Sequence, residues 1–377
     1  MLALTGGRVF TGDRILHDRA VLIDNGRITD LVPENAVPMA ITRRPLHGGL
    51  LAPGFIDVQV NGGGGVLLND APTVETVGRI AAAHRRFGTT GLLPTLITDV
   101  PERMPKAISA VRDAIAAGMP GVLGIHLEGP FLNVARKGVH EPDKIRPATD
   151  AEVDILTSLG VGRTVVTLAP ELAPAGFIAK LAAAGVRVCA GHTAATYDET
   201  MAGLREGVTG FTHLFNAMSP FGSREPGAVG AALDDPGSWC GLIVDGHHVH
   251  PASLRVAIAA KARGRMMLVT DAMSPVGSDD PSFHLRGETV TVRDGVCATA
   301  DGTLAGSALD MASAVRNTVH MLGIDLTEAL RMASLYPAAF LGLDRELGRI
   351  AAGFRADLVL LDEALAVEAT WIAGEEG

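Results

Sequence analysis

Eight short apolar runs recur along the middle of this chain, and helical patterns separate most of them. The runs are continuously apolar rather than alternating, as strands that are covered on both faces tend to be. Helical spacing of apolar residues is clearest at 73–87, 102–117, 175–184 and 251–262. Eight strands that alternate with helices predict an α/β fold with a (β/α)₈ barrel. We expect the strands near 50–60, 88–98, 120–129, 163–171, 186–194, 210–217, 239–246 and 265–272.

The two ends of the chain have a different texture from the middle. Residues 1–50 and 345–377 contain short β-type runs, with Asn25-Gly26 as a hairpin turn signal. We therefore expect a small β-sandwich domain built from both termini, around a barrel domain at 51–344. A β-hairpin insertion is expected near 283–303, with turns at Asp294-Gly295 and Asp301-Gly302. Helical patterns resume at 308–322 and 326–335.

Composition excludes several classes of protein. The net charge of −10 argues against general binding of nucleic acid, and aromatic residues, at 4%, are too few for rows of base-stacking platforms. No apolar run approaches the roughly 18 residues of a membrane span. Cys189, Cys240 and Cys297 form no CxxC pair and are expected to be buried thiols in a reducing compartment. We expect a cytoplasmic protein.

Metal-binding or acidic residues stand at or just beyond the ends of four predicted strands. Glu128, His192 and His213 lie at the ends of the third, fifth and sixth strands, and Asp271 ends the eighth. In a (β/α)₈ barrel all strand C-termini face one rim, where the active site lies. Carboxylate and imidazole ligands suit Zn²⁺ or Fe²⁺, and such an ion activates water for attack. Asp271 is our candidate for the acid/base that exchanges the water proton. His126 is expected to be a core or supporting residue.

Several motifs carry a family resemblance. The segment PGFIDVQVNG (53–62) resembles the first-strand signature of the amidohydrolase superfamily, except that Gln59 and Asn61 replace its His-x-His pair. That departure is similar to the one-metal branch of N-acetylglucosamine-6-phosphate deacetylases. The segments that agree with this family are HLEGPFLN (126–133), KGVHEP (137–142), GHTAAT (191–196), THLFNAM (212–218), GSREPG (222–227), DGHHVHP (245–251), TDAM (270–273) and LAGSALDM (304–311).

The resemblance implies a role for each matching residue. Glu128, His192 and His213 would bind one divalent metal ion, and Asp271 would be the catalytic acid/base. His140 would hydrogen-bond the acetyl carbonyl oxygen. The sugar phosphate would be held by Asn216, the Ala217 backbone, Arg224 and His248, the last two reaching the site of the neighbouring subunit in a homodimer. His247 is an alternative to His248, and a second, weaker metal near Gln59 and Asn61 stays open.

The implied activity is hydrolysis of N-acetylglucosamine 6-phosphate to glucosamine 6-phosphate and acetate, with Zn²⁺ as the expected metal and Fe²⁺ or Co²⁺ as alternatives. Another N-acetylhexosamine phosphate, such as N-acetylgalactosamine 6-phosphate, is the alternative substrate. A nucleobase deaminase would not need the phosphate contacts expected at Arg224 and His248. A non-catalytic barrel would be expected to have lost Asp271 or one of the metal ligands, yet all are present.

Overall fold

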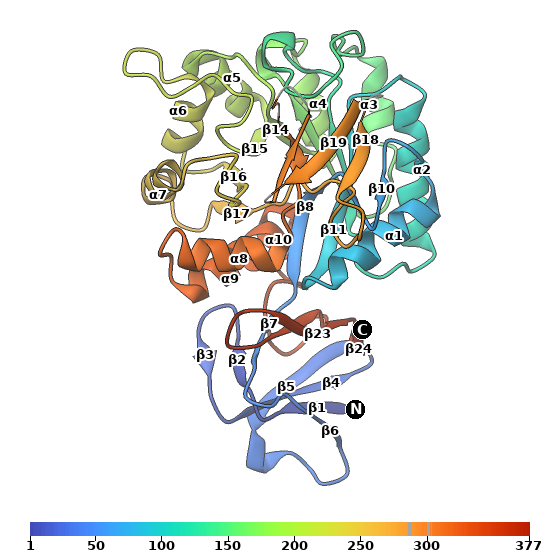
Figure 1. Cartoon of the computed structure of the whole chain (residues 1–377), viewed down its shortest axis with the longest axis vertical. Helices are drawn as coiled ribbons and strands as arrows, with labels where there is room; N and C mark the ends of the chain where they lie inside the picture. The colour runs from blue at the N-terminus through green and yellow to red at the C-terminus, as the bar shows by residue number, and fades with distance from the viewer. Residues whose placement is uncertain (286–287, 294, 300–301, 303) are drawn as a thin grey trace.

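The computed structural model describes residues 1–377 except 286–287, 294, 300–301 and 303. Figure 1 shows a large body that holds the barrel strands and their helices, with a smaller β unit below it. Both ends of the chain lie in the smaller unit (Figure 1).

The large body is built around a sheet of eight parallel strands, nearly closed as a barrel, which confirms the predicted fold class. Strand order follows chain order from one edge to the other, and every neighbouring pair is parallel. The strands are β8 (Phe55–Val60), β11 (Thr89–Ile97), β12 (Gly124–Glu128), β13 (Arg163–Leu168), β14 (Arg187–Ala190), β15 (Val208–Phe211), β16 (Trp239–Leu242) and β17 (Met266–Leu268).

The first predicted barrel strand is two strands in the structure. β7 (Leu50–Pro53) pairs with β2 (Arg8–Phe10) and β22 (Leu358–Leu361) in the smaller β unit. Only β8 pairs with the barrel strand β11. The apolar run is continuous across Pro53 and Gly54, so its pattern alone does not reveal that the pairing partners change there.

Helices cover the outside of the barrel, and the predicted helical segments are confirmed. Local capping sets where several begin: Thr73 accepts a hydrogen bond from the Thr76 backbone, and Thr196 and Glu199 form a reciprocal capping box. The helices are α1 (Val74–Arg85), α2 (Arg103–Ala116), α3 (Ala151–Leu156), α4 (Phe177–Ala183), α5 (Tyr197–Glu206), α6 (Gly227–Asp234), α7 (Pro251–Ala260), α8 (Met311–His320), α9 (Leu326–Ala333) and α10 (Leu335–Leu341).

The insertion after β17 is larger than the predicted hairpin. It is a four-stranded antiparallel sheet made of β18 (Ser282–Leu285), β19 (Glu288–Arg293), β20 (Val296–Ala298) and β21 (Leu304–Ser307). Its apolar side packs against residues of the barrel rim, including Ile97 and Met273. The turn residues Asp294 and Asp301 lie outside the described residues.

The smaller unit consists of two sheets that share an apolar core. Leu4 and Val21 from one sheet pack with Leu51, Leu358 and Trp371 from the other. The first sheet holds β1 (Leu2–Thr5), β4 (Arg19–Asp24), β5 (Arg27–Pro33) and β6 (Thr42–Pro45); the second adds β3 (Ile15–Leu16), β23 (Val367–Ile372) and β24 (Glu375–Glu376) to β2, β7 and β22. The domain boundaries at residues 50 and 345 stay predictions.

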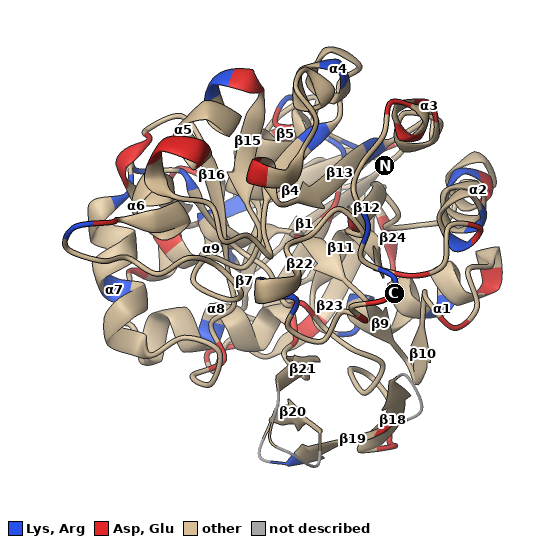
Figure 2. Ribbon diagram, turned by 90° about the horizontal axis from the view of Figure 1, so that it is seen from above, with Lys and Arg blue, Asp and Glu red and all other residues tan. Residues whose placement is uncertain are grey.

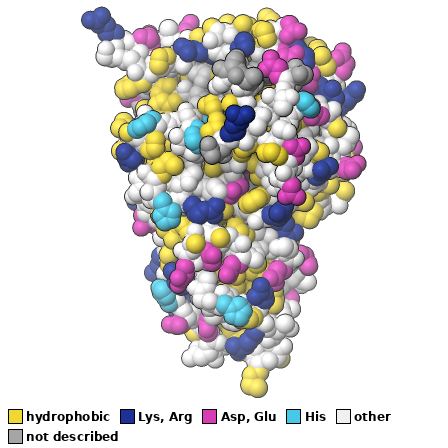
Figure 3. All heavy atoms as spheres, viewed as in Figure 1, with side chains coloured by type: hydrophobic (Ala, Val, Ile, Leu, Met, Phe, Trp, Pro, Cys, Tyr) yellow, Lys and Arg dark blue, Asp and Glu magenta, His cyan; other side chains and the backbone are white. Residues whose placement is uncertain are grey.

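The other expectations from composition can be compared with the structure. All three cysteines are free and buried, as predicted. Among the described residues, no helix is both long enough and apolar enough to cross a membrane. Figure 2 shows basic and acidic residues interspersed over the outer helices, and Figure 3 shows a similar mixture on one face of the molecule.

Candidate metal centre

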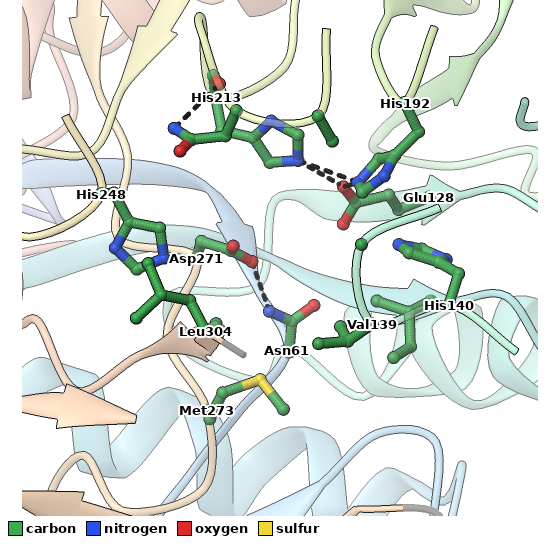
Figure 4. Close-up of a pocket in the computed structure, with 15 residues that line it drawn as sticks. Asn61, Glu128, Val139, His140, His192, His213, His248, Asp271, Met273 and Leu304 are labelled. Carbon is green, nitrogen blue, oxygen red and sulfur yellow. Dashed lines mark hydrogen bonds and ion pairs between the residues drawn. The ribbon is translucent and has the colours of Figure 1, made fainter. Parts of the chain in front are cut away.

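A pocket of about 320 Å³ opens at the rim formed by the C-terminal ends of the barrel strands (Figure 4). Most of the predicted site residues meet there, although they are spread over more than a hundred positions. The lining residues are Asn61, Ile97, Glu128, Gly138, Val139, His140, His192, His213, Asn216, Ala217, His248, Asp271, Met273, Leu304 and Gly306.

Four non-glycine residues of the pocket have an unusual backbone with positive φ, among them Ala217 at 52°. His192, His213 and Asp271 follow the ends of β14, β15 and β17, and their φ angles are 49°, 34° and 53°. Non-glycine residues rarely adopt this left-handed region, which costs on the order of 1–3 kcal/mol per residue. Strained residues of this kind concentrate at functional sites. Other non-glycine residues with positive φ, such as Asn25 and Ala373, lie outside the barrel, so the strain supports the assignment of this rim together with its side-chain chemistry.

The predicted metal ligands converge on one point. Glu128 Oε1 lies 3.1 Å from His192 Nε2 and 2.9 Å from His213 Nε2, and the two imidazole nitrogens are 3.1 Å apart. Ligand atoms around a tetrahedral Zn²⁺ stand roughly 3.3 Å apart, given metal–ligand bonds of about 2.0–2.2 Å. All three side chains are buried. The donor set and its spacing therefore fit a single divalent cation.

The other ring nitrogen of His192, Nδ1, has its own hydrogen-bond partner. His192 Nδ1 lies 2.9 Å from the Arg136 carbonyl oxygen, which can only accept a hydrogen bond. The hydrogen of His192 is therefore on Nδ1, and the lone pair of Nε2 points toward Glu128 and His213. This is the arrangement by which proteins orient histidine ligands of metals.

His140 belongs to the same cluster. Donor atoms of Glu128, His140 and His192 all lie within 4.8 Å of one another, a grouping that could also hold an ion. The closer spacing of the Glu128, His192 and His213 atoms favours that set as the ligands. His140 Nδ1 lies 2.7 Å from Thr98 Oγ1. When Nδ1 accepts the Thr98 hydroxyl hydrogen, Nε2 carries the other hydrogen and can donate to a substrate oxygen.

The two carboxyl groups of the pocket have opposite electrostatic character. Burial alone raises the pKa of Glu128, but the adjacent imidazole groups of His192 and His213 outweigh it and hold that pKa well below its usual range. Burial, reinforced by the Glu128 charge, raises the pKa of Asp271 to about 6. The Glu128 carboxylate is thus held in its ionised form, whereas the pKa of Asp271 lies closer to neutral pH.

The first-strand amides act as hydrogen-bond donors to these carboxylates. Gln59 Nε2 lies 3.2 Å from both Glu128 Oε2 and Asp271 Oδ1, and Asn61 Nδ2 lies 2.6 Å from Asp271 Oδ1. An amide nitrogen cannot be a metal ligand in this orientation. The positions of the two amides fit a site for one metal ion. Gln59 Nε2 lies within hydrogen-bond distance of both Glu128 and Asp271. The sequence predicted that these amides are weak metal ligands at most and left a second metal near them open, but it gave no sign of their hydrogen bonds to the two carboxylates.

Only some of the residues predicted to contact the substrate lie in the pocket. Asn216 and Ala217 line the pocket, and Asn216 Nδ2 also donates to the His213 carbonyl oxygen at 3.2 Å. His126 does not line it; it is buried behind the site, with Nε2 2.7 Å from Thr167 Oγ1, as expected of a supporting residue. Arg224 is exposed and lies outside the pocket of its own chain.

His248 lines the pocket of its own chain, beside Asp271 (Figure 4). That it reaches the site of a neighbouring subunit stays a prediction. Asp245 determines its position: one carboxylate oxygen accepts the backbone N–H groups of His247 and His248, and the other lies 2.6 Å from His248 Nδ1. His247 is more exposed and does not line the pocket.

Comparisons with known proteins agree with this site. The family model described as "Amidohydrolase family" matches residues 50–376, and the one described as "NagA composite domain" matches residues 1–51. The chain therefore belongs to the amidohydrolase family.

Proteins similar to this chain over nearly their full length are named as deacetylases of amino-sugar phosphates. The chain is 43% identical to an N-acetylgalactosamine-6-phosphate deacetylase of Shewanella sp. (strain ANA-3), over 100% of this chain and 95% of that protein. It is 39% identical to the N-acetylglucosamine-6-phosphate deacetylase of Homo sapiens, over 100% of this chain and 95% of the other. The crystal structure of N-acetylglucosamine-6-phosphate deacetylase from Pasteurella multocida superposes with a TM-score of 0.97, at 37% identity, covering 100% of this chain and 99% of that one.

Proposed function

We propose that this protein hydrolyses N-acetylglucosamine 6-phosphate to glucosamine 6-phosphate and acetate. The observation that carries the proposal is the pairing of a buried Glu–His–His cluster with a separate carboxyl group, Asp271, in one pocket. The names of full-length relatives supply the substrate. A pocket of about 320 Å³ has room for a single sugar.

The residues of this chain support a water-addition mechanism. When bound at Glu128, His192 and His213, a divalent cation supplies Lewis acidity, which lowers the pKa of water and polarises an amide carbonyl. Asp271 accepts a proton from the attacking water, and its raised pKa suits this exchange. His140 donates to the carbonyl oxygen as negative charge develops there. The protonated Asp271 then delivers its proton to the departing amine nitrogen.

Several finer features are part of the proposal. We propose Zn²⁺ as the metal because carboxylate and imidazole ligands in tetrahedral spacing favour it, with Fe²⁺ and Co²⁺ as alternatives. We propose that Asn216, the Ala217 backbone and His248 contact the sugar phosphate. Arg224 would reach the phosphate across a homodimer interface, since it lies outside its own pocket. A cytoplasmic location fits the three buried free thiols.

N-acetylgalactosamine 6-phosphate is a second candidate substrate. The relatives at 43% and 40% identity carry that name, whereas those named for the glucosamine compound are 36% to 39% identical. The two substrates differ only in the configuration at C4 of the sugar. The same site residues would act on either.

One assay tests the function. Acetate release is measured from both acetylhexosamine 6-phosphates and from their unphosphorylated forms, on protein of known metal content, with and without chelator. We expect release from a phosphorylated sugar that chelator abolishes and added metal restores. The ratio of kcat/KM values for the two phosphates decides between the substrates. No release from either phosphate would contradict the proposal.

A further inference from the structure

The barrel is not closed in the same way all round. β8 and β17 are the two edge strands of the parallel sheet, and we call the line where they meet the seam. Among the described residues, backbone hydrogen bonds cross the seam only from Gln59 and Asp271 outward, beginning with Asp271 N to Gln59 O at 3.0 Å. Below that level no strand ladder joins β8 to β17.

The side chain of Asp57 crosses the seam just below this level. Its Oδ2 accepts the Thr270 hydroxyl at 2.5 Å, and its Oδ1 accepts the Thr270 backbone N–H at 3.3 Å. Both residues are completely buried. Two directed hydrogen bonds to a carboxyl group in a dry interior fix the position of the Thr270 backbone more firmly than packing alone.

The same carboxyl group also touches the other side of the site. Asp57 Oδ1 accepts the backbone N–H of Gln59 at 3.2 Å. Gln59 in turn donates from Nε2 to Asp271 Oδ1, also at 3.2 Å. Asp57 therefore holds the backbones of Gln59 and Thr270, and the Gln59 side chain in turn contacts the carboxylate of Asp271, the residue after Thr270.

A second anchor holds Thr270 and Asp271 from the opposite side. Ser307, at the end of β21, donates its hydroxyl to the Thr270 carbonyl oxygen at 2.5 Å, and its backbone N–H donates to the Asp271 carbonyl oxygen at 3.0 Å. The Asp271 backbone is thus fixed between β8 and β21. A residue with φ of 53° persists only when its surroundings determine its conformation in this way.

We propose that Asp57 is a positioning residue, which ties Thr270 to the first barrel strand and thereby aims the Asp271 carboxylate into the metal site. The inference rests on the proposed deacetylase activity, in which Asp271 exchanges the proton. Asp57 itself does not line the pocket. Its effect is on the geometry of Asp271 and not on substrate binding.

The test removes one hydroxyl group. Thr270→Val keeps the β-branched shape but deprives Asp57 Oδ2 of its donor and the Ala272 backbone N–H of its acceptor. We expect kcat to fall about 10- to 100-fold, the loss that a displacement of roughly 1 Å causes, while KM changes less than about threefold. Metal content should equal that of the unsubstituted protein. Thr270→Ser restores the hydroxyl and should return kcat to within about threefold. Asp57→Ala removes both carboxyl oxygens and leaves the Thr270 hydroxyl and its contact with Ala272 in place, so it should lose at least as much as Thr270→Val.

Thr318→Val is the matched control. Thr318 is a completely buried threonine on α8 whose hydroxyl donates to the Ala314 carbonyl oxygen at 2.8 Å. The same atoms are lost there, but away from the seam, so kcat should stay within about twofold. A Thr270→Val protein with normal kcat, or a loss that Thr318→Val matches, would overturn the inference.

A crystal structure of Thr270→Val separates this inference from the proposed function. We expect the Asp271 carboxylate to move away from Gln59 Nε2. If it stays at 3.2 Å, Asp57 does not position it, whatever the enzyme acts on. An unsubstituted protein that releases no acetate would contradict the function alone.

Discussion

The two sides of the barrel mouth hold their carboxyl groups in different ways. On the metal side, Glu128 lies within hydrogen-bond distance of the imidazoles of His192 and His213. On the seam side, Asp271 is held by the neutral amides of Gln59 and Asn61. The pKa of Glu128 is accordingly well below its usual range, whereas burial raises that of Asp271 to about 6.

This difference matches two different tasks. A group that binds a cation must remain ionised, and imidazole neighbours favour the ionised form. A group that exchanges a proton needs a pKa near the working pH, and neutral donors in a dry pocket leave it there. One pocket can therefore carry out both tasks with the same functional group. Substitutions on each side of the pocket can show whether metal binding and proton exchange are separate.

The largest effect is expected on the metal side. Glu128→Gln removes the only carboxylate between the two histidines, so metal content after dialysis should fall below about a tenth and acetate release by at least ~10³-fold. Inductively coupled plasma mass spectrometry measures the metal content, and the acetate assay measures the activity. Glu328→Gln is the control, because Glu328 is hydrogen-bonded to Arg331 and Tyr336 away from the pocket. Full metal content in Glu128→Gln would show that Glu128 is not needed to bind the metal.

On the seam side, a substitution should abolish activity but leave the metal bound. Asp271→Asn keeps the shape of the side chain but cannot accept the water proton, so kcat should fall about 10²- to 10⁴-fold. Metal content and substrate affinity, measured by mass spectrometry and calorimetry, should stay close to those of the unsubstituted protein. Near-normal turnover would remove Asp271 from the acid/base role.

On the seam side, the carboxyl group of Asp57 should make the stability of the protein depend on pH. Burial raises the pKa of Asp57 to about 7, above the value near 3.8 expected in the unfolded chain. Its contribution to stability is therefore complete below about pH 4 and is lost as the pH rises toward 7, by a few kcal/mol. Urea unfolding of metal-free protein should show the advantage of the unsubstituted chain over Asp57→Asn shrinking across this range. A difference that is flat from pH 4 to 8 would contradict this.

The smallest effect is expected outside both sides. Arg224→Ala should raise KM about tenfold for the phosphorylated sugar and leave KM for the unphosphorylated sugar unchanged, because only a phosphate group pairs with the guanidinium. Mixed dimers sharpen the test. If Arg224 acts across an interface, dimers of Arg224→Ala and Asp271→Asn subunits should regain a normal KM at one site. Without that recovery, Arg224 does not reach a neighbouring site.

Much of this architecture is predictable from the sequence, since each feature follows from a short-range pattern. Continuous apolar runs predict the parallel strands, and residues at strand ends share a rim in any such barrel. Glu128, His192, His213 and Asp271 therefore come together as expected. Their residue types also predict the chemistry, because few other functions require two histidines and two carboxylates at one rim.

The features that sequence reasoning missed depend on contacts that leave no pattern. The carbonyl oxygen that orients His192 belongs to Arg136, and any residue at position 136 would supply it. The hydroxyl beside His140 comes from Thr98, which follows β11 and is 42 positions earlier in the chain. β21 is short and contains Gly306, so its run resembles a loop until it pairs with β20. Placing His248 required knowing how the Asp245 turn folds.

The smaller β unit has a consequence for how this protein is made. β7 lies between β2 and β22, and β22 is synthesised roughly three hundred residues after β7. While the ribosome makes the barrel, the early strands expose an apolar edge that has no partner. The nascent chain is therefore vulnerable to aggregation until β22 emerges, and chaperone demand should fall sharply at that point.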